Sequence, residues 1–187
     1  MRRKTQEQGL KNKFSDIYIP EKLRALKNFD CIFGAWVDSN PTDVGLVVKD
    51  ANNSIVTTVH QPLGSSSSFF TCDGIDYEIE TLHTWFATKV LKGSGSEKVL
   101  IKSTAGYFCW TFERDSLPAF HQLVWQKDRF RFWSPDRFSG FFEDRKLVGG
   151  IWPILNGKFV TGRALVVGRE TPMPIRVFLL YLGLSSW

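Results

Sequence analysis

Three apolar runs separated by short polar turns constrain the fold of this chain more than any other feature. The runs are "DCIFGAWVDS", "VGLVVKD" and "SIVTTVHQ", and they lie between residues 30 and 61. Short apolar runs bounded by Asn, Asp, Pro and Ser are typical of strands. The segment "ANN" before the third run favours a tight hairpin turn, because Asn tolerates the left-handed backbone. We therefore expect a three-strand meander here.

Helices are predicted on both sides of this meander. The segment "FSDIYIPEKLRALKNF" predicts a short N-terminal helix, with Leu23, Leu26 and Phe29 at helical spacing. The segment "DYEIETLHTWFATKVLK" predicts a helix over residues 76–92, because its apolar residues share one arc when each residue advances by about 100°. A further helix is expected over residues 116–129.

The remaining segments predict strands. "EKVLIKSTAG" is expected to be a strand, and the Asn-Gly pair between "GIWPIL" and "KFVTG" indicates a hairpin. "IRVFLLYLGL" is interpreted as a final strand. The element order indicates an α+β (mixed α/β) fold. We expect a basic arm and N-terminal helix in residues 1–29, a main domain in 30–148, and a β-rich extension in 149–187 packed on the same domain.

Charge, hydropathy and cysteine content restrict the partners and the cellular location expected for the protein. The net charge of +5 permits a polyanionic partner without requiring one. The basic N-terminus is not followed by an apolar core, so no secretory signal is expected. The longest apolar stretch, "VFLLYLGL", is too short to span a bilayer, so no membrane partner is expected. The three cysteines show no disulfide or metal-site spacing, which favours an intracellular location in cytoplasm or nucleus.

The order of these elements resembles the ribonuclease H fold. "VDSNPTDVGLVVKD" is similar to the first strand, turn and second strand of that family, "DYEIETLHTW" to its first helix, and "VLIKSTAGY" to its fourth strand. The resemblance covers about residues 30–112. It implies a three-strand meander, helix, strand and helix, followed here by the β-rich C-terminal segment.

The resemblance also implies an acidic site. Family members hold two divalent metal ions, usually magnesium, on carboxylates, and the metals assist phosphodiester cleavage. Asp38 matches the ligand on the first strand, and Glu78 matches the ligand on the helix. The family's third ligand, an Asp after the fourth strand, is replaced by Ser103 and Thr104. Further carboxylates that do not align with the family are Asp136, Glu143 and Asp144. The implied site is incomplete, which points to a catalytically degenerate domain without a cofactor.

Both acids also have ordinary structural explanations. An Asp at the end of a strand can bond the backbone of the turn that follows, as in "DSNP" around Asp38. A Glu in the first turn of a helix is favoured by the helix dipole. Glu78 nevertheless falls inside the apolar arc of the expected helix, whereas Glu80 faces away from that arc. Glu78 therefore requires either an edge position or a partner.

The stretch "WQKDRFRFWSPDRFSGFFEDRK", residues 125–146, interleaves seven aromatic residues with six Lys or Arg. Such interleaving suits single-stranded nucleic acid, in which bases stack on rings and cations meet phosphates. The residues expected to make these contacts are Lys127, Arg129, Arg131, Trp133 and Arg137. Four acids reduce the local excess to +2. Core packing with cationic side chains reaching water, or a protein interface, would explain the same pattern.

Three functions follow from these features. The first is a ribonuclease H-like domain that binds nucleic acid, RNA or an RNA–DNA hybrid, or that assembles into a nucleoprotein. The second is an active magnesium-dependent nuclease that uses Asp38 and Glu78. The third is a structural or interaction protein, such as a small viral coat protein with a basic arm. The third would replace the helix of residues 76–92 with strands of a sandwich.

Overall fold

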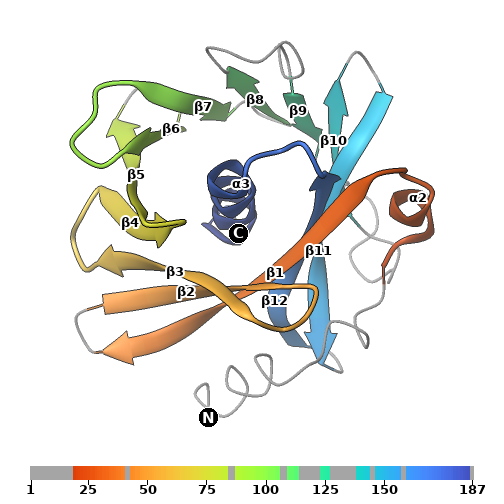
Figure 1. The fold of residues 1–187 in the computed structure, drawn as a ribbon, viewed down its shortest axis with the longest axis horizontal. Coiled ribbons are helices and arrows are strands. Elements are labelled where there is room, and N and C mark those ends of the chain that lie inside the picture. The colour runs from red at the N-terminus through yellow and green to blue at the C-terminus, as the bar shows by residue number, and fades with distance from the viewer. Residues whose placement is uncertain are drawn as a thin grey trace.

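Antiparallel strands form a closed barrel around the C-terminal helix α3 (Figure 1). The computed structural model describes residues 19–40, 43–83, 87–105, 109–113, 123–126, 138–143, 146–156 and 159–185. The strands are β1 (Phe29–Asn40), β2 (Asp43–Asp50), β3 (Ile55–Pro62), β4 (Ser67–Cys72), β5 (Ile75–His83), β6 (Ala87–Gly93), β7 (Val99–Ala105), β8 (Cys109–Glu113), β9 (Leu123–Gln126), β10 (Ser139–Glu143), β11 (Lys146–Asn156) and β12 (Phe159–Gly168). The helices are α2 (Glu21–Arg24) and α3 (Met173–Ser185).

Each strand pairs with the next strand in sequence, and β1 closes the ring against β12. The closing ladder runs from Phe29 opposite Gly168 to Gly34 opposite Arg163. Among the described strands, closure leaves no edge that could pair with another chain. It also divides the side chains into an inward set and an outward set, because neighbours along a strand point to opposite faces.

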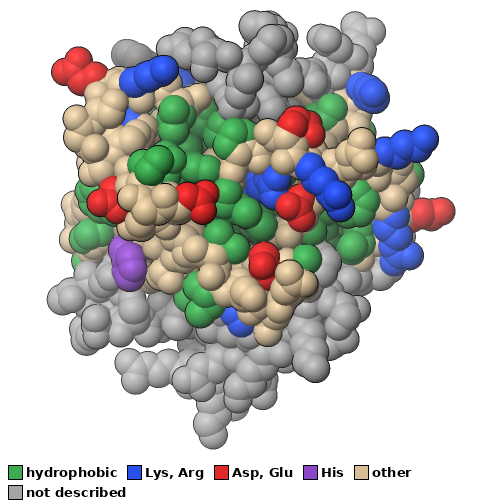
Figure 2. All heavy atoms as spheres, in the orientation of Figure 1, with side chains coloured by type: hydrophobic (Ala, Val, Ile, Leu, Met, Phe, Trp, Pro, Cys, Tyr) green, Lys and Arg blue, Asp and Glu red, His purple; other side chains and the backbone are tan. Residues whose placement is uncertain are grey.

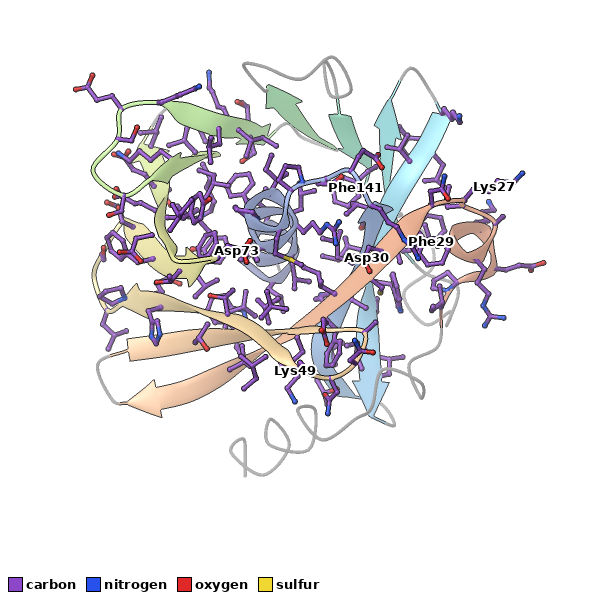
Figure 3. The ribbon with its side chains drawn as sticks, viewed as in Figure 1. Lys27, Phe29, Asp30, Lys49, Asp73 and Phe141 are labelled. Atoms are coloured by element: carbon purple, nitrogen blue, oxygen red, sulfur yellow. The ribbon has the colours of Figure 1, made fainter. Side chains whose placement is uncertain are left out.

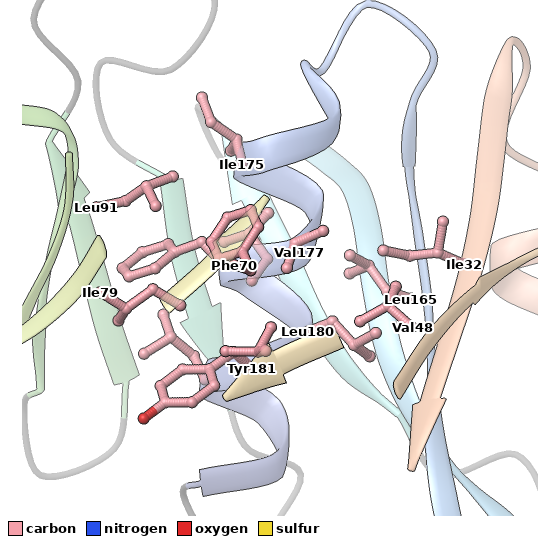
Figure 4. Close-up of a cluster of buried hydrophobic side chains, with 14 of the residues drawn as sticks. Ile32, Val48, Phe70, Ile79, Leu91, Leu165, Ile175, Val177, Leu180 and Tyr181 are labelled. Carbon is pink, nitrogen blue, oxygen red and sulfur yellow. The ribbon is translucent and has the colours of Figure 1, made fainter. Parts of the chain in front are cut away.

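The inward set packs against α3 (Figure 4). Ile32, Leu46, Val48, Ile79, Leu91 and Leu165 from the wall belong to one buried cluster with Ile175, Val177, Phe178, Leu180 and Tyr181 from the helix. Apart from Arg176 in its first turn and Ser185 at its end, the helix is apolar on all sides, because strands surround it. Gly34 permits the close approach of the helix, since a Cβ there would lie 3.0 Å from Leu180 Cδ2.

A second buried cluster lies outside the barrel, beneath α2. It contains Leu23, Cys31, Phe33, Trp152, Ile154, Ala164 and Val166. Leu23 of α2 can enter this layer because position 150 is a glycine: a Cβ there would lie 2.8 Å from Leu23 Cδ2. The strands β1, β11 and β12 are therefore covered on both faces.

A buried arginine fixes the start of α3. Arg176 donates hydrogen bonds to the carbonyl oxygens of Thr171 and Arg169, both at 2.7 Å. Its Nη1 also lies 2.5 Å from Asp30 Oδ2. Asp30 lies at the start of β1, beside the segment that leads into α3 (Figure 3). The guanidinium thus joins the helix to the first strand of the closing ladder.

The predicted ribonuclease H-like α+β fold is wrong, because the described chain is mostly strand and forms one closed antiparallel barrel. The predicted meander of β1, β2 and β3 is confirmed, as are the strand β7 and the hairpin of β11 and β12. The N-terminal helix is confirmed only as the short α2. The expected domain boundary between residues 148 and 149 falls within β11.

The other predicted helices are wrong where the structure describes them. Residues 76–92 form most of β5 and β6, in which Tyr77 and Ile79 point inward while Glu78 and Glu80 point outward. Residues 123–126, inside the third expected helix, form β9. The predicted final strand is instead α3, since a continuous apolar run suits a helix enclosed by a barrel.

Candidate binding site at the seam between β3 and β4

The barrel wall is weakest between β3 and β4. Their ladder has a single registered pair, His60 opposite Phe69. The neighbouring ladder of β2 and β3 has seven pairs, and that of β4 and β5 has six. Beyond the single pair, the hydroxyl of Thr57 donates a 2.7 Å hydrogen bond to the carbonyl oxygen of Thr71. At this point a side-chain hydrogen bond joins β3 to β4, whereas backbone hydrogen bonds join the neighbouring strands elsewhere in the wall.

A cavity of about 390 Å³ lies at this seam. Its lining residues are Thr57, Thr58, His60, Phe69, Phe70, Thr71, Asp76, Tyr77 and Ser94. Phe70 and Tyr77 belong to the interior cluster, and their rings stack with centroids 5.2 Å apart. Asp76 Oδ1 accepts a 2.6 Å hydrogen bond from Thr71 Oγ1. The volume and the mixture of aromatic and polar groups are typical of ligand sites.

The wall around the cavity is acidic in an otherwise basic protein. Residues 50–88 contain five Asp or Glu and no Lys or Arg, so this segment carries −5 and the rest of the chain carries +10. Figure 2 shows acidic and hydrophobic side chains on the left of the view, where β3, β4 and β5 lie in Figure 1, while most visible Lys and Arg lie elsewhere. The exposed hydrophobic residues of this wall are Ile55, Leu63, Phe69 and Ile75.

Two of the acids have a cationic partner. Lys92 Nζ lies 2.9 Å from Glu80 Oε2 and 3.6 Å from Glu78 Oε2. The hydrogen bond to Glu80 is the main cause that raises the pKa of Lys92. Among the described residues, by contrast, no Lys or Arg forms an ion pair with Asp73 or Asp76. The negative charge beside the cavity therefore remains available to a ligand.

The structure does not bring together the two predicted metal ligands. Asp38 lies on β1 and Glu78 lies on β5, so three strands separate them around the wall. Glu78 accepts a 2.7 Å hydrogen bond from Ser67 Oγ, which explains its position without a metal. Within the described ranges, no group of three His, Cys, Asp or Glu side chains could hold a metal ion.

The other predicted site residues are dispersed. Ser103 is buried in the wall, where its hydroxyl donates to the carbonyl oxygen of Lys89, and Thr104 lies beside it on β7. Glu143 ends β10. The predicted nucleic-acid contacts Lys127, Arg129, Arg131, Trp133 and Arg137, together with Asp136 and Asp144, lie outside the described residues. Nucleic-acid binding by that stretch stays a prediction.

The residues around the seam were not identified from the sequence. The absence of Lys and Arg between residues 50 and 88 is visible in the sequence and could have marked the acidic wall. The opening of the seam could not have been found in this way, because it depends on how β3 and β4 diverge after His60 and Phe69.

Comparison with known proteins gives no match: no family model, no curated protein and no solved structure is significantly similar to the chain. In the part of the chain that the structure describes, no helix is both long and apolar enough to cross a membrane. We therefore infer function from the geometry of this barrel.

Proposed function

We propose that this chain is a protein-interaction domain that binds a basic, extended peptide segment along the wall of β3, β4 and β5. The observation that carries the proposal is the seam cavity, with Asp76 in its lining and hydrophobic residues exposed around it. An intracellular location belongs to the same proposal, and the two buried free thiols Cys31 and Cys72 support it.

Charge determines the class of partner. A Lys or Arg side chain that enters the cavity would meet the carboxylate of Asp76 and the aromatic rings of Phe69 and Tyr77. Carboxylates and ring faces both attract cations. An anionic partner such as nucleic acid would instead be repelled by this wall.

The hydrophobic residues favour an extended partner. Ile55 and Ile75 begin β3 and β5 at one end of the barrel, whereas Leu63 follows β3 at the other end. A strand of eight residues spans about 26 Å at about 3.3 Å per residue. A peptide of similar length could therefore contact hydrophobic residues at both ends and place a cationic side chain in the cavity between them.

A direct test uses a fluorescent eight-residue peptide that alternates Arg with Leu, and a second peptide in which Glu replaces each Arg. We expect the basic peptide to bind and the acidic peptide not to bind. The double variant Asp73→Asn, Asp76→Asn should weaken binding of the basic peptide at least about tenfold. The double variant Glu21→Gln, Glu170→Gln makes the same change in net charge, in α2 and in the segment after β12, and should leave binding unchanged.

Fluorescence anisotropy at two salt concentrations measures these affinities, with thermal melts as a check that each variant is folded. Added salt should weaken binding, since exposed charges are screened. Equal binding of the two peptides, or equal losses in the two double variants, would show that the acidic wall does not select the partner.

We propose nucleic-acid binding as a second function, on the basis of charge and composition elsewhere in the chain. The part of the chain outside residues 50–88 carries +10, and the stretch 125–146 combines aromatic with cationic residues. These features support binding of nucleic acid, RNA or an RNA–DNA hybrid.

A further inference from the structure

The turn between β4 and β5 presents two carboxylates to solvent. Asp73 and Gly74 form this turn, and both have positive φ, 52° and 76°, as in a tight hairpin. Asp76 follows on β5 and lines the seam cavity. Both carboxylates are exposed, and among the described residues neither forms an ion pair with Lys or Arg. This turn is therefore the part of the acidic wall whose charge is not compensated.

The other acids of residues 50–88 are already engaged. Asp50 accepts two 2.9 Å hydrogen bonds from backbone N–H groups of the turn that follows it. Glu78 and Glu80 lie beside Lys92. A cationic ligand consequently gains most at the two carboxylates of the β4–β5 turn, where it displaces no existing cation.

Residues 1–18, which precede the described part of the chain, carry the opposite charge. They contain five Lys or Arg and two Asp or Glu, a net charge of +3. Three of these cations, Arg2, Arg3 and Lys4, are consecutive. A guanidinium forms paired hydrogen bonds with a carboxylate, so two neighbouring arginines suit two neighbouring carboxylates. The charge of this segment thus matches that of the turn.

The segment is also long enough to reach the seam. Ile19 packs against the buried cluster outside the barrel, on β1, β11 and β12. From β12 to β4 there are four steps between neighbouring strands, about 19 Å around the wall at about 4.8 Å per step. A displacement of about 26 Å along an eight-residue strand would lengthen this path to about 32 Å. Lys4 and Ile19 are 15 residues apart, and an extended chain of that length spans about 50 Å.

We propose that residues 1–18 are an intramolecular ligand of the seam, with Arg2 and Arg3 bound to the carboxylates of Asp73 and Asp76. This inference rests on the proposed function and names the chain's own N-terminal segment as the first occupant of that peptide site. A flexible tether gives an effective concentration on the order of a millimolar. At micromolar protein, the segment therefore binds its own barrel in preference to a second copy.

A stronger partner can displace this ligand. Residues 2–8 supply cations but contain no hydrophobic side chain for the exposed Ile55, Leu63 or Ile75. A peptide that combines cations with hydrophobic residues makes these additional contacts and therefore replaces the segment. The N-terminal segment thus screens the acidic turn from weak basic ligands and gives way to the partner of the proposed function.

The experiment compares two full-length double variants that change the net charge equally. Arg2→Glu, Arg3→Glu reverses the charge of the intramolecular ligand. Lys22→Glu, Lys27→Glu is the control, because both lysines are exposed, in α2 and just after it. The probe is the fluorescent peptide that alternates Arg with Leu, measured by anisotropy. We expect the first variant to bind this peptide at least about tenfold more tightly than the control, because its seam is unoccupied.

The outcomes separate this inference from the proposed function. Equal affinities of the two variants for the basic peptide would overturn the inference and leave the peptide site in place. If the basic peptide binds neither variant nor the wild type, or if the acidic peptide binds equally well, the proposed function fails and the inference fails with it.

A second measurement locates the segment directly. A carbodiimide joins amines to nearby carboxylates, and it is applied to an equal mixture of unlabelled and ¹⁵N-labelled wild-type protein. We expect Lys4 to be joined to Asp73 or Asp76 within single chains. Mass spectra with as many mixed-label as same-label products would assign the seam to a second copy and overturn the intramolecular contact. Coupling of Lys4 to Glu170, beyond β12, as often as to the turn acids would also overturn it.

Discussion

The two seams at β1–β12 and β3–β4 close the same barrel in different ways. The β1–β12 seam has six registered pairs, lies beneath the cluster around Leu23 and Trp152, and is joined to α3 by Arg176. The β3–β4 seam has one pair and a cavity. The wall is thus regular at the first seam, where both faces are buried, and open at the second, where one face meets solvent. We infer that the first seam stabilises the fold and that the second can bind a partner.

The largest expected effect is at the covered seam. Trp152→Ala removes a large side chain that is 2% exposed, and it should lower the free energy of unfolding by about 3–5 kcal/mol. Urea denaturation followed by fluorescence measures this loss. Leu155→Ala on the same strand is the control, because Leu155 is 49% exposed and its loss should stay near 0.5 kcal/mol. Similar losses in both variants would mean that the outer cluster does not stabilise the barrel.

A smaller effect is expected at the open seam. Thr57→Val removes the hydroxyl that bonds Thr71 and should cost about 1 kcal/mol. Amide hydrogen exchange should become faster in β3 and β4 while β1 and β12 are unchanged. Thr58→Val alters the neighbouring position, whose hydroxyl makes no hydrogen bond across this seam among the described contacts, and should have less effect. If exchange rises equally at both seams, they do not open independently.

The smallest expected effect compares two buried cysteines. Burial, with a further contribution from Asp73, raises the pKa of Cys72 to about 11, and burial also raises the pKa of Cys31. Both thiols therefore stay protonated at pH 8 and should react slowly with iodoacetamide. Cys72 ends β4, beside the open seam, whereas Cys31 pairs with Val166 in the closing ladder. Cys72 should be modified first.

The pH dependence of Cys72 has a definite sign. In the unfolded chain a thiol loses its proton near 9.0, but in the folded protein it does so near 11. The stabilisation from a protonated Cys72 is thus complete below pH 9 and is lost as pH rises through 11. Labelling of Cys72 should speed up over this range. Earlier labelling of Cys31 than of Cys72 would contradict the assignment of the weaker seam.

Local turn chemistry predicted much of the wall. The turn "ANN" between β2 and β3, and the Asn-Gly pair between β11 and β12, marked hairpins that the structure contains. Asn53 has a φ of 67°, the left-handed conformation that Asn tolerates. Such signals are carried by a few adjacent residues, so they can be identified without knowledge of the rest of the fold.

The errors arose where periodicity was ambiguous. In β5 the alternation of Tyr77, Glu78, Ile79 and Glu80 has a period of two, but apolar residues further along also share a helical arc. The pairing of β5 with β6 selects the period of two, since it places Glu78 and Glu80 beside Lys92 on the outer face. Apolarity alone could not distinguish a buried strand from α3. The positions of His60 and Lys89 depend on register and closure, which no local pattern encodes.

The chain order of the central helix has a consequence for how the protein is made. On the ribosome, α3 emerges only after every described strand. The strands are therefore synthesised before the helix that fills the interior of the barrel. The first and last strands are also distant in sequence, with Phe29 opposite Gly168. Such long-range pairing folds slowly, and a nascent wall with exposed apolar side chains is prone to aggregate. We expect newly synthesised chains to depend on a chaperone until α3 has been translated and enclosed.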